Sequence, residues 1–374
     1  MKKKYLKLII FLMFLQMFFC CGCSQQSQLH EKFMVRAMTI DLGASEGNCI
    51  TDRGVGEDNC ITVIAQGNDF KNPLGKEEPS VRNVEVSGES LSLALDKLNK
   101  ITGLKPLYSQ NLIIIVGEEA AKRGTEKFMD FFLRYYENRL STKLRVAKGK
   151  ASEIFEAKNN GKPIKASTIR SLAEDKTDSD VLKFESDIKS GICDPVTMTL
   201  EKNEKGEVIC ENLAVFSKDS LVCFLNKEET MGSQILSGIS KLGAIDITED
   251  KKNFSCNIDK VKTKITPFLN NGNIEFNIET KTSVNILETE EILSSMDDID
   301  KNLKSNINRK ITEICKKAIE KTLSLQCDIF KFGKIFRNKY PKYFKNIESS
   351  WKDHLKTLKY DLKSETEISV VGMG

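Results

Sequence analysis

Apolar and polar positions recur along the chain with two different periods, which predict strands in some segments and helices in others. Phe33–Leu42 and Cys60–Gln66 have strand character, and the segment between them is rich in Gly, Asn and Asp, which predicts a loop. Leu112–Val116 is a continuous apolar run, typical of a strand that is buried on both faces. Helices are predicted to begin within Ser87–Ser90, near Glu118 and Glu119, and at Thr125.

The second half of the chain predicts more strands and one long helix. Strands are predicted at Val208–Phe216 and Leu221–Leu225, and Asn270–Asn273 is typical of a hairpin turn. Leu358, Tyr360 and Leu362 alternate with charged residues, as in a half-buried strand. A single apolar stripe with spacings of three and four predicts a long helix that packs on the protein's own sheet or, alternatively, in a coiled coil. The stripe consists of Ile292, Met296, Ile299, Leu303, Ile307, Ile311, Ile314 and Ala318.

These elements predict an α+β chain of two or three mixed α/β domains. Its sheets are expected to be largely antiparallel or mixed and flanked by helices, with the long helix in the C-terminal domain. The expected organisation is a signal peptide (1–22), a tether (23–30), an N-terminal α/β domain (31–157), a bridging region (158–205) and a C-terminal α/β domain (206–374).

The first residues predict export. Four lysines precede the apolar stretch Leu8–Phe19, which is short for a helix that spans a membrane. Gly22-Cys23 then matches the junction at which bacterial lipoproteins are cleaved, so Cys23 is the predicted site of lipid attachment. Cys21 is an alternative attachment site, and an ordinary secretory signal or an uncleaved anchor helix remain alternatives to the lipoprotein signal.

The charge of the chain gives no reason to expect a nucleic-acid partner. The whole chain carries a formal charge of +4, and the signal segment contains four lysines and no acid. The remainder is therefore close to neutral, without the basic field that nucleic-acid binding requires.

Eleven cysteines are many for an exported protein, but their spacing is not that of a disulfide framework. No CxxC pair occurs outside the signal segment, and most of the cysteines are expected to be small buried apolar residues. Cys49 and Cys60 are the exception, because they flank the polar loop Thr51–Asn59 and form a candidate disulfide across a hairpin.

The sequence offers no set of residues for catalysis or metal binding. It contains two histidines, His30 and His354, and it lacks HExxH and GxSxG motifs. Gly54-Val55-Gly56 lies within a polar loop rather than between a strand and a helix, so it is interpreted as a turn. We therefore expect no catalytic residue, no metal ligand and no cofactor, and the protein is predicted not to be an enzyme.

Residues 331–345 combine six basic side chains with five aromatic ones and contain no acid. Such a stretch suits anionic headgroups or an acidic partner surface, which makes Lys334, Arg337 and Lys339 candidates for facing a partner or the membrane. The alternative is a pair of helices whose aromatic side chains belong to the core and whose lysines are solvated.

Several segments, taken in order, carry a resemblance to a known family. They are Leu112–Gly124, Phe131–Arg139, Asn212–Phe216, Asp219–Val222, Glu228–Thr230, Asp328–Gly333, Tyr340-Pro341 and Trp351. Together with Gly22-Cys23, they resemble the C subunit of spore germinant receptors, the Ger(x)C lipoprotein family. The chain departs from the family pattern at Ser24, where Trp or Tyr is usual, and in the early strand Ala37–Asp41.

The resemblance implies a role in spore germination. It implies a fold of several α/β domains, lipid anchoring on the outer leaflet of the inner spore membrane, and assembly with two integral membrane subunits, A and B. It implies no catalytic or nutrient-binding residue. The alternative is a solute-binding lipoprotein of a transport system, which requires two doubly wound lobes of alternating strands and helices.

Overall fold

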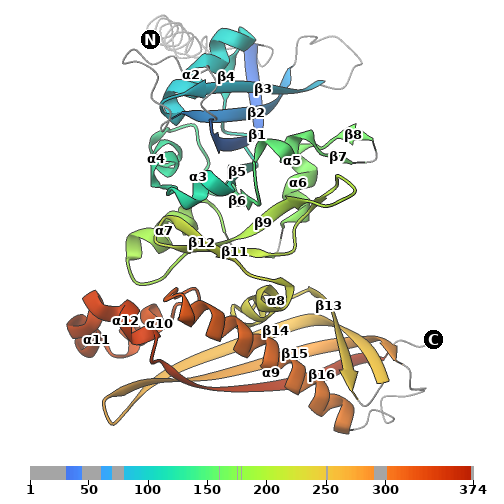
Figure 1. Cartoon of the computed structure of the whole chain (residues 1–374), viewed down its shortest axis with the longest axis vertical. Helices are drawn as coiled ribbons and strands as arrows, with labels where there is room; N and C mark the ends of the chain where they lie inside the picture. Colours follow the sequence, from blue (N-terminus) through green and yellow to red (C-terminus); the bar gives the residue numbers. More distant parts are fainter. Residues whose placement is uncertain are drawn as a thin grey trace, which may run out of the picture.

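The computed structural model describes residues 31–43, 60–69, 80–159, 161–174, 176–177, 179–249, 252–289 and 301–371. These residues form two large sheets, each covered by helices, with the N-terminal sheet in the upper half of Figure 1 and the C-terminal sheet in the lower half. The predicted mixed α/β fold class is thereby confirmed. The predicted signal peptide, the tether, Cys23 and Cys49 lie outside the described residues.

The N-terminal sheet is mixed. Its strands are β1 (Lys32–Leu42), β2 (Ile61–Asp69), β3 (Ser80–Gly88), β4 (Lys105–Leu107), β5 (Ile113–Gly117), β6 (Lys143–Ala147), β9 (Val196–Lys202), β10 (Val208–Ile209), β11 (Leu213–Ser217) and β12 (Ser220–Phe224). Their order is β12-β11-β9-β6-β5-β1-β2-β3, with β4 beside β1 and β10 beside β9. The central pairs β1–β5, β5–β6 and β6–β9 are parallel, and antiparallel strands flank them on both sides.

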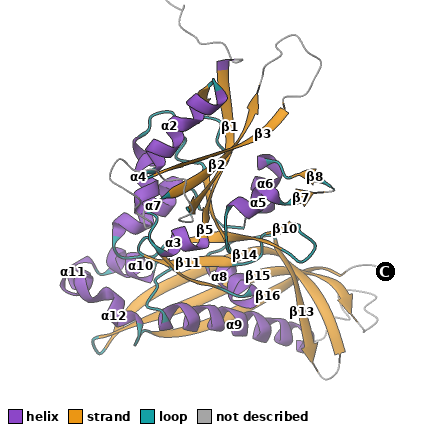
Figure 2. Cartoon of the chain, turned by 45° about the horizontal axis from the view of Figure 1, so that its top comes forward, coloured by secondary structure: helices purple, strands orange, loops and turns teal. Residues whose placement is uncertain are grey.

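Helices cover both faces of this sheet (Figure 2). They are α2 (Leu91–Thr102), α3 (Glu118–Lys122), α4 (Glu126–Arg134), α5 (Ser152–Glu156), α6 (Ala166–Leu172) and α7 (Val181–Ser190). The fully buried strand β5 shows why helices must cover both faces of the sheet. Ile114 and Val116 enter the core with α2, α3, α4 and α7, whereas Ile113 and Ile115 enter the core with α5 and α6.

Residues 158–205, expected to bridge two domains, form the hairpin strands β7 (Lys158–Asn159) and β8 (Lys162–Pro163), the helices α6 and α7, and β9. Because β9 pairs with both β6 and β11, the N-terminal sheet continues to Phe224, beyond the boundary expected at residue 205. Buried Arg145 helps to hold this polar region on the sheet. Its guanidinium donates hydrogen bonds to the carbonyls of Ala173 and Ser179, each at 2.9 Å.

The C-terminal sheet has the order β13-β14-β15-β16. Its elements are β13 (Leu242–Glu249), β14 (Lys252–Asn270), β15 (Asn273–Thr289), β16 (Lys359–Val371), α8 (Lys227–Leu236) and α9 (Lys301–Ser324). The predicted hairpin joins β14 to β15, with Asn271 and Gly272 at φ angles of 49° and 82°, the left-handed region that Asn-Gly turns favour. The stripe of α9 packs on α8 and on this sheet through its residues from Leu303 onward, and its first three members lie outside the described residues.

Three short helices, α10 (Phe332–Lys339), α11 (Pro341–Ile347) and α12 (Trp351–Leu355), lead from α9 to β16. They lie at one end of the C-terminal sheet (Figure 1). Their apolar side chains belong to the same core as those of α9 and of the lower face of the N-terminal sheet. The two sheets therefore share a continuous apolar core.

Candidate functional site

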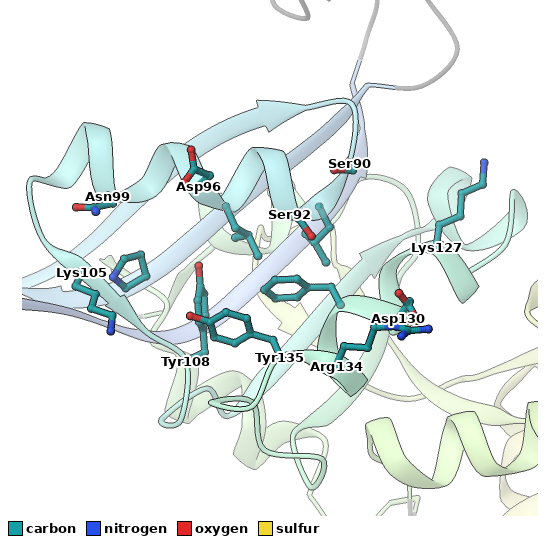
Figure 3. Close-up of a pocket in the computed structure, with 14 residues that line it drawn as sticks. Ser90, Ser92, Asp96, Asn99, Lys105, Tyr108, Lys127, Asp130, Arg134 and Tyr135 are labelled. Carbon is teal, nitrogen blue, oxygen red and sulfur yellow. Dashed lines mark hydrogen bonds and ion pairs between the residues drawn. The ribbon is translucent and has the colours of Figure 1, made fainter.

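A groove of about 660 Å³ lies between α2 and α4 in the N-terminal domain (Figure 3). Ser90 caps the start of α2 by accepting a backbone hydrogen bond, and Gly103 ends the helix in the left-handed region, at φ 69°. Because α2 buries its apolar face on the sheet, Ser92, Asp96 and Asn99 are left to form a polar wall of the groove.

Three aromatic side chains form the floor of the groove. Tyr108 lies edge-on to Phe131 and Tyr135, with ring centroids 6.0 and 5.5 Å away, and Phe131 stacks on Tyr135 at 5.3 Å. Tyr108 is only 4% exposed, and its hydroxyl points across the groove towards α2 (Figure 3). No described residue forms a hydrogen bond with this hydroxyl. Burial raises the pKa of Tyr108, so the hydroxyl is neutral and available as a donor.

Charged side chains of both signs surround this floor. On α4, the Arg134 Nε donates to Asp130 Oδ1 at 2.6 Å. On α2, Asp96 Oδ2 lies 2.8 Å from the Nζ of Lys100. Lys105 and Lys127 complete the lining of the groove. The arrangement is an aromatic centre within a polar, mixed-charge rim.

The basic and aromatic segment 331–345 divides its two kinds of side chain between core and surface. Phe332, Phe336 and Phe344 are buried, and the ring of Phe336 stacks on that of Trp351 at 6.2 Å. Trp351 is buried as well, with 2% of its surface exposed. The aromatic side chains therefore act as core residues, as in a helix pair with solvated lysines.

The three candidate partner-facing residues do not lie on a single feature. Lys334 and Arg337 line a second, smaller groove of about 490 Å³ beside α7, to which Leu133 at the end of α4 also contributes. Lys339 instead donates a hydrogen bond from its Nζ to the carbonyl of Pro267 on β14, at 2.8 Å. Whether these residues face a partner or the membrane stays a prediction.

Several residues that carry the family resemblance in the C-terminal domain form one buried, hydrogen-bonded cluster around Asp328. Asp328 is buried, and its carboxylate accepts hydrogen bonds from the backbone of Phe332 (2.8 Å) and Gly333 (2.7 Å) and from Trp351 Nε1 (3.1 Å). Burial outweighs these bonds and raises the pKa of Asp328 to about 6. The carboxylate thus fixes the start of α10 and the orientation of Trp351.

A second buried carboxylate, Asp194, joins this cluster to the N-terminal sheet. The backbone N–H of Asp328 donates to Asp194 Oδ2 at 2.9 Å, and the N–H of Asp194 donates to the carbonyl of Asp328 at 3.0 Å. Lys352 pairs with Asp194 Oδ1 at 2.8 Å. This cluster ties the helices α10 and α12 to the segment that precedes β9 of the N-terminal sheet.

The described cysteines are poor nucleophiles. Burial raises the pKa of Cys256, Cys315 and Cys327 to about 12 each, so these thiols remain protonated at neutral pH. Cys60 is buried at the start of β2 and is disulfide-bonded. Because Cys49 lies outside the described residues, the Cys49–Cys60 pairing stays a prediction.

Within the described ranges, no group of three or more His, Cys, Asp or Glu side chains is placed to hold a metal ion. None of the described helices is both long and apolar enough to cross a membrane. The Nδ1 of His354 lies 3.0 Å from the backbone carbonyl of Ser350, so it is engaged within its own helix region.

Sequence reasoning did not find the groove between α2 and α4. Its polar wall looks, in sequence, like the solvated side of any amphipathic helix. One signal was present, because α4 and the residue after it carry more aromatic side chains than one buried stripe needs. Phe128 and Phe132 enter the core, whereas Phe131 and Tyr135 remain partly exposed in the groove.

Comparisons with known proteins give a consistent result. One family model, described as "Spore germination protein N-terminal domain", matches residues 25–201, and another, described as "Spore germination B3/GerAC like, C-terminal", matches residues 211–372. Spore germination protein B3 of Bacillus subtilis (strain 168) is 22% identical over 97% of this chain and 96% of its own length. Spore germination protein YndF of the same strain is 23% identical over 78% of this chain and 74% of its own length.

A solved structure shares the fold. The crystal structure of the GerBC protein superposes with a TM-score of 0.57 at 19% sequence identity, covering 83% of this chain and 93% of that one. The arrangement of two helix-covered sheets is therefore common to both proteins.

Proposed function

Because the chain belongs to the GerAC-like family of spore germination proteins, and thereby to the germinant receptor C subunits, we propose that it is a lipid-anchored receptor component. In this proposal it assembles with two integral membrane subunits, A and B, on the outer face of the inner spore membrane. The observation that carries the proposal is the ordered match of both family domains, at residues 25–201 and 211–372.

The proposed anchor is a diacylglyceryl group on the sulfur of Cys23. Its support is the Gly22-Cys23 junction after a basic start and an apolar stretch. Two acyl chains provide stable anchoring, since each buried methylene contributes about 0.8 kcal/mol and a single chain binds only reversibly. The anchor therefore needs no contribution from the protein's surface.

We further propose that the protein acts through contacts and not through catalysis. The buried, protonated thiols and the engagement of His354 with its own backbone support this view. A solute-binding lipoprotein is a weaker candidate, because the C-terminal sheet is built largely from a long antiparallel hairpin and not from a doubly wound lobe.

The anchor is tested by replacing Cys23 with Ala in the full chain and following fatty-acid labelling and membrane fractionation in sporulating cells. The variant should lose the label and move to the supernatant, while Cys21→Ala should keep both the label and the membrane location. A Cys23→Ala protein that is still labelled and sedimented with membranes would show that the lipid is elsewhere.

The receptor role is tested by tagging the wild-type protein and isolating it from detergent-extracted spore membranes. Subunits A and B should co-isolate with it. Their absence, with the protein intact and membrane-bound, would contradict the role as a receptor component.

A further inference from the structure

The lining of the α2–α4 groove has the composition of a protein interface. Eight of its fourteen lining residues carry polar or charged side chains, and these surround a centre formed by Tyr108, Phe131 and Tyr135. Protein interfaces combine aromatic centres with polar rims in this way. Sites for small molecules are instead lined mostly by apolar side chains, with only a few polar ones.

The position of the groove in the fold places it near the proposed lipid anchor. Lys105 and Pro106 line the groove and belong to β4, whose Lys105 pairs with Lys32 at the start of β1. Lys32 follows Cys23 by nine residues. An extended chain spans at most about 3.5 Å per residue, so this end of the domain lies within about 30 Å of the lipid attachment. A membrane subunit is therefore within reach of the groove.

The charges around the groove distinguish a protein partner from a bare lipid surface. Asp96 and Asp130 lie on opposite walls, from α2 and α4, and would repel anionic headgroups. Lys105, Lys127 and Arg134 would in turn repel a purely cationic partner. A polypeptide segment that carries both signs of charge can complement this rim.

One polar group in the floor lacks a partner. The Tyr108 hydroxyl is held in a side chain that is 4% exposed, points into the groove and has no hydrogen bond to any described residue. Because its oxygen reaches the surface of the groove, a ligand that occupies the groove can accept a hydrogen bond from this hydroxyl in place of water.

We propose that the α2–α4 groove is the docking site for a segment of one of the integral membrane subunits. The segment places an apolar or aromatic side chain over Phe131 and Tyr135, bonds to the Tyr108 hydroxyl and pairs its charges with those of the rim. This inference rests on the proposed role as a receptor component and adds the place at which contact is made.

The test fills the groove without disturbing the core. Asn99 lines the groove and is exposed, whereas its neighbour Lys100 is exposed and lies outside the groove. In the full-length, lipidated protein, Asn99→Trp should reduce co-isolation of the membrane subunits at least tenfold, and Lys100→Trp should leave it within about twofold of wild type. Both variants should keep their membrane location and thermal unfolding midpoint, which separates a docking defect from misfolding.

A photoreactive benzoylphenylalanine in place of Ser92, on the groove wall, provides an independent readout. Illumination should give an adduct with a membrane subunit, and Asn99→Trp should abolish this adduct. Normal co-isolation of Asn99→Trp, or adducts with lipid alone, would overturn the groove assignment while leaving the receptor role intact. Failure of the wild-type protein to co-isolate with any membrane subunit would instead overturn the receptor role.

Discussion

At the scale of single residues, Asp328 has the largest structural role among the residues that carry the family resemblance. Its carboxylate binds three N–H groups, two from the backbone that begins α10 and one from Trp351. Its backbone binds Asp194, which lies just before β9 of the N-terminal sheet. Gly333 is required beside it, because a Cβ there would overlap the ring of Trp351 and the side chain of Ile192. One buried acid thus organises a helix start and a domain contact.

Asp328 should give the protein a measurable pH dependence of stability. Burial raises its pKa from the ordinary 3.8 to about 6, so the folded protein binds this proton more readily than the unfolded chain between pH 4 and 6. The contribution of this group to the free energy of unfolding therefore increases as the pH falls from about 6 towards 4. Urea unfolding of the wild type at pH 5 and pH 7.5 measures this effect.

The matched variants are Asp328→Asn and Asp353→Asn, the latter at an exposed position on α12. Asp328→Asn leaves a buried N–H without an acceptor and should cost about 1–3 kcal/mol at neutral pH. It should also flatten the dependence of stability on pH, whereas Asp353→Asn should change neither quantity. If the free energy of unfolding of Asp328→Asn depended on pH as strongly as that of the wild type, the Asp328 carboxyl would not be the source of the pH dependence.

At the scale of elements, the C-terminal domain depends on the close approach of α8 to α9. Asn226 and Glu229 form a capping box that fixes the start of α8. Gly232 on this helix faces the backbone of α9, and a Cβ at that position would overlap the carbonyl of Ile314. Glu228 adds an ion pair to Lys310 at 2.6 Å, but both groups are partly exposed, so this pair contributes little. The glycine contact decides the spacing of the two helices.

Gly232→Ala should therefore push α8 and α9 apart and destabilise the protein by about 1–3 kcal/mol, the range for overpacking a core. The control is Gly243→Ala on β13, because a Cβ there meets no atom within 4 Å and the backbone is not left-handed. Chemical unfolding of both variants provides the measurement. Equal stability of the two would show that the helices separate without cost.

At the scale of the whole molecule, the two grooves are connected by one helix. Arg134 on α4 lines the groove beside α2, and its neighbour Leu133 lines the second groove together with Lys334 and Arg337. The helices that line the two grooves, α2, α4, α7 and α10, lie along the same side of the view in Figure 2.

Reversing Lys334, Arg337 and Lys339 to Glu should abolish receptor assembly while lipidation remains intact, if this segment faces a partner. Lys339 also bonds to Pro267, so a double variant with only Lys334→Glu and Arg337→Glu keeps that contact and isolates the effect of the groove. Lys342→Glu with Lys345→Glu, at exposed positions of α11, is the charge-matched control. Normal co-isolation of subunits A and B with the triple variant would leave these lysines as solvated surface.

Elements whose burial pattern is local were predictable from the sequence. In Leu112–Val116 and in the stripe of α9, neighbouring positions indicate which side chains meet the core. In the Asn-Gly turn, they indicate the backbone conformation. The type of each element was therefore predicted correctly. The region 158–205 was harder to predict, because its order depends on Arg145, which lies outside it in the chain and binds its backbone carbonyls within the fold.

The sequence by itself determined the α+β class, the resemblance to the family and the scarcity of residues suited to catalysis, because these depend on residue identity and short-range spacing. Only the tertiary structure decided which surfaces are available for contact. Asn99 and Lys100 are adjacent polar residues on one helix, yet only Asn99 lines the groove. Lys334 and Lys339 belong to one basic stretch, yet they face different elements. The reason is physical: the surroundings of a polar side chain come from segments that are distant in the chain and meet only when the core is packed.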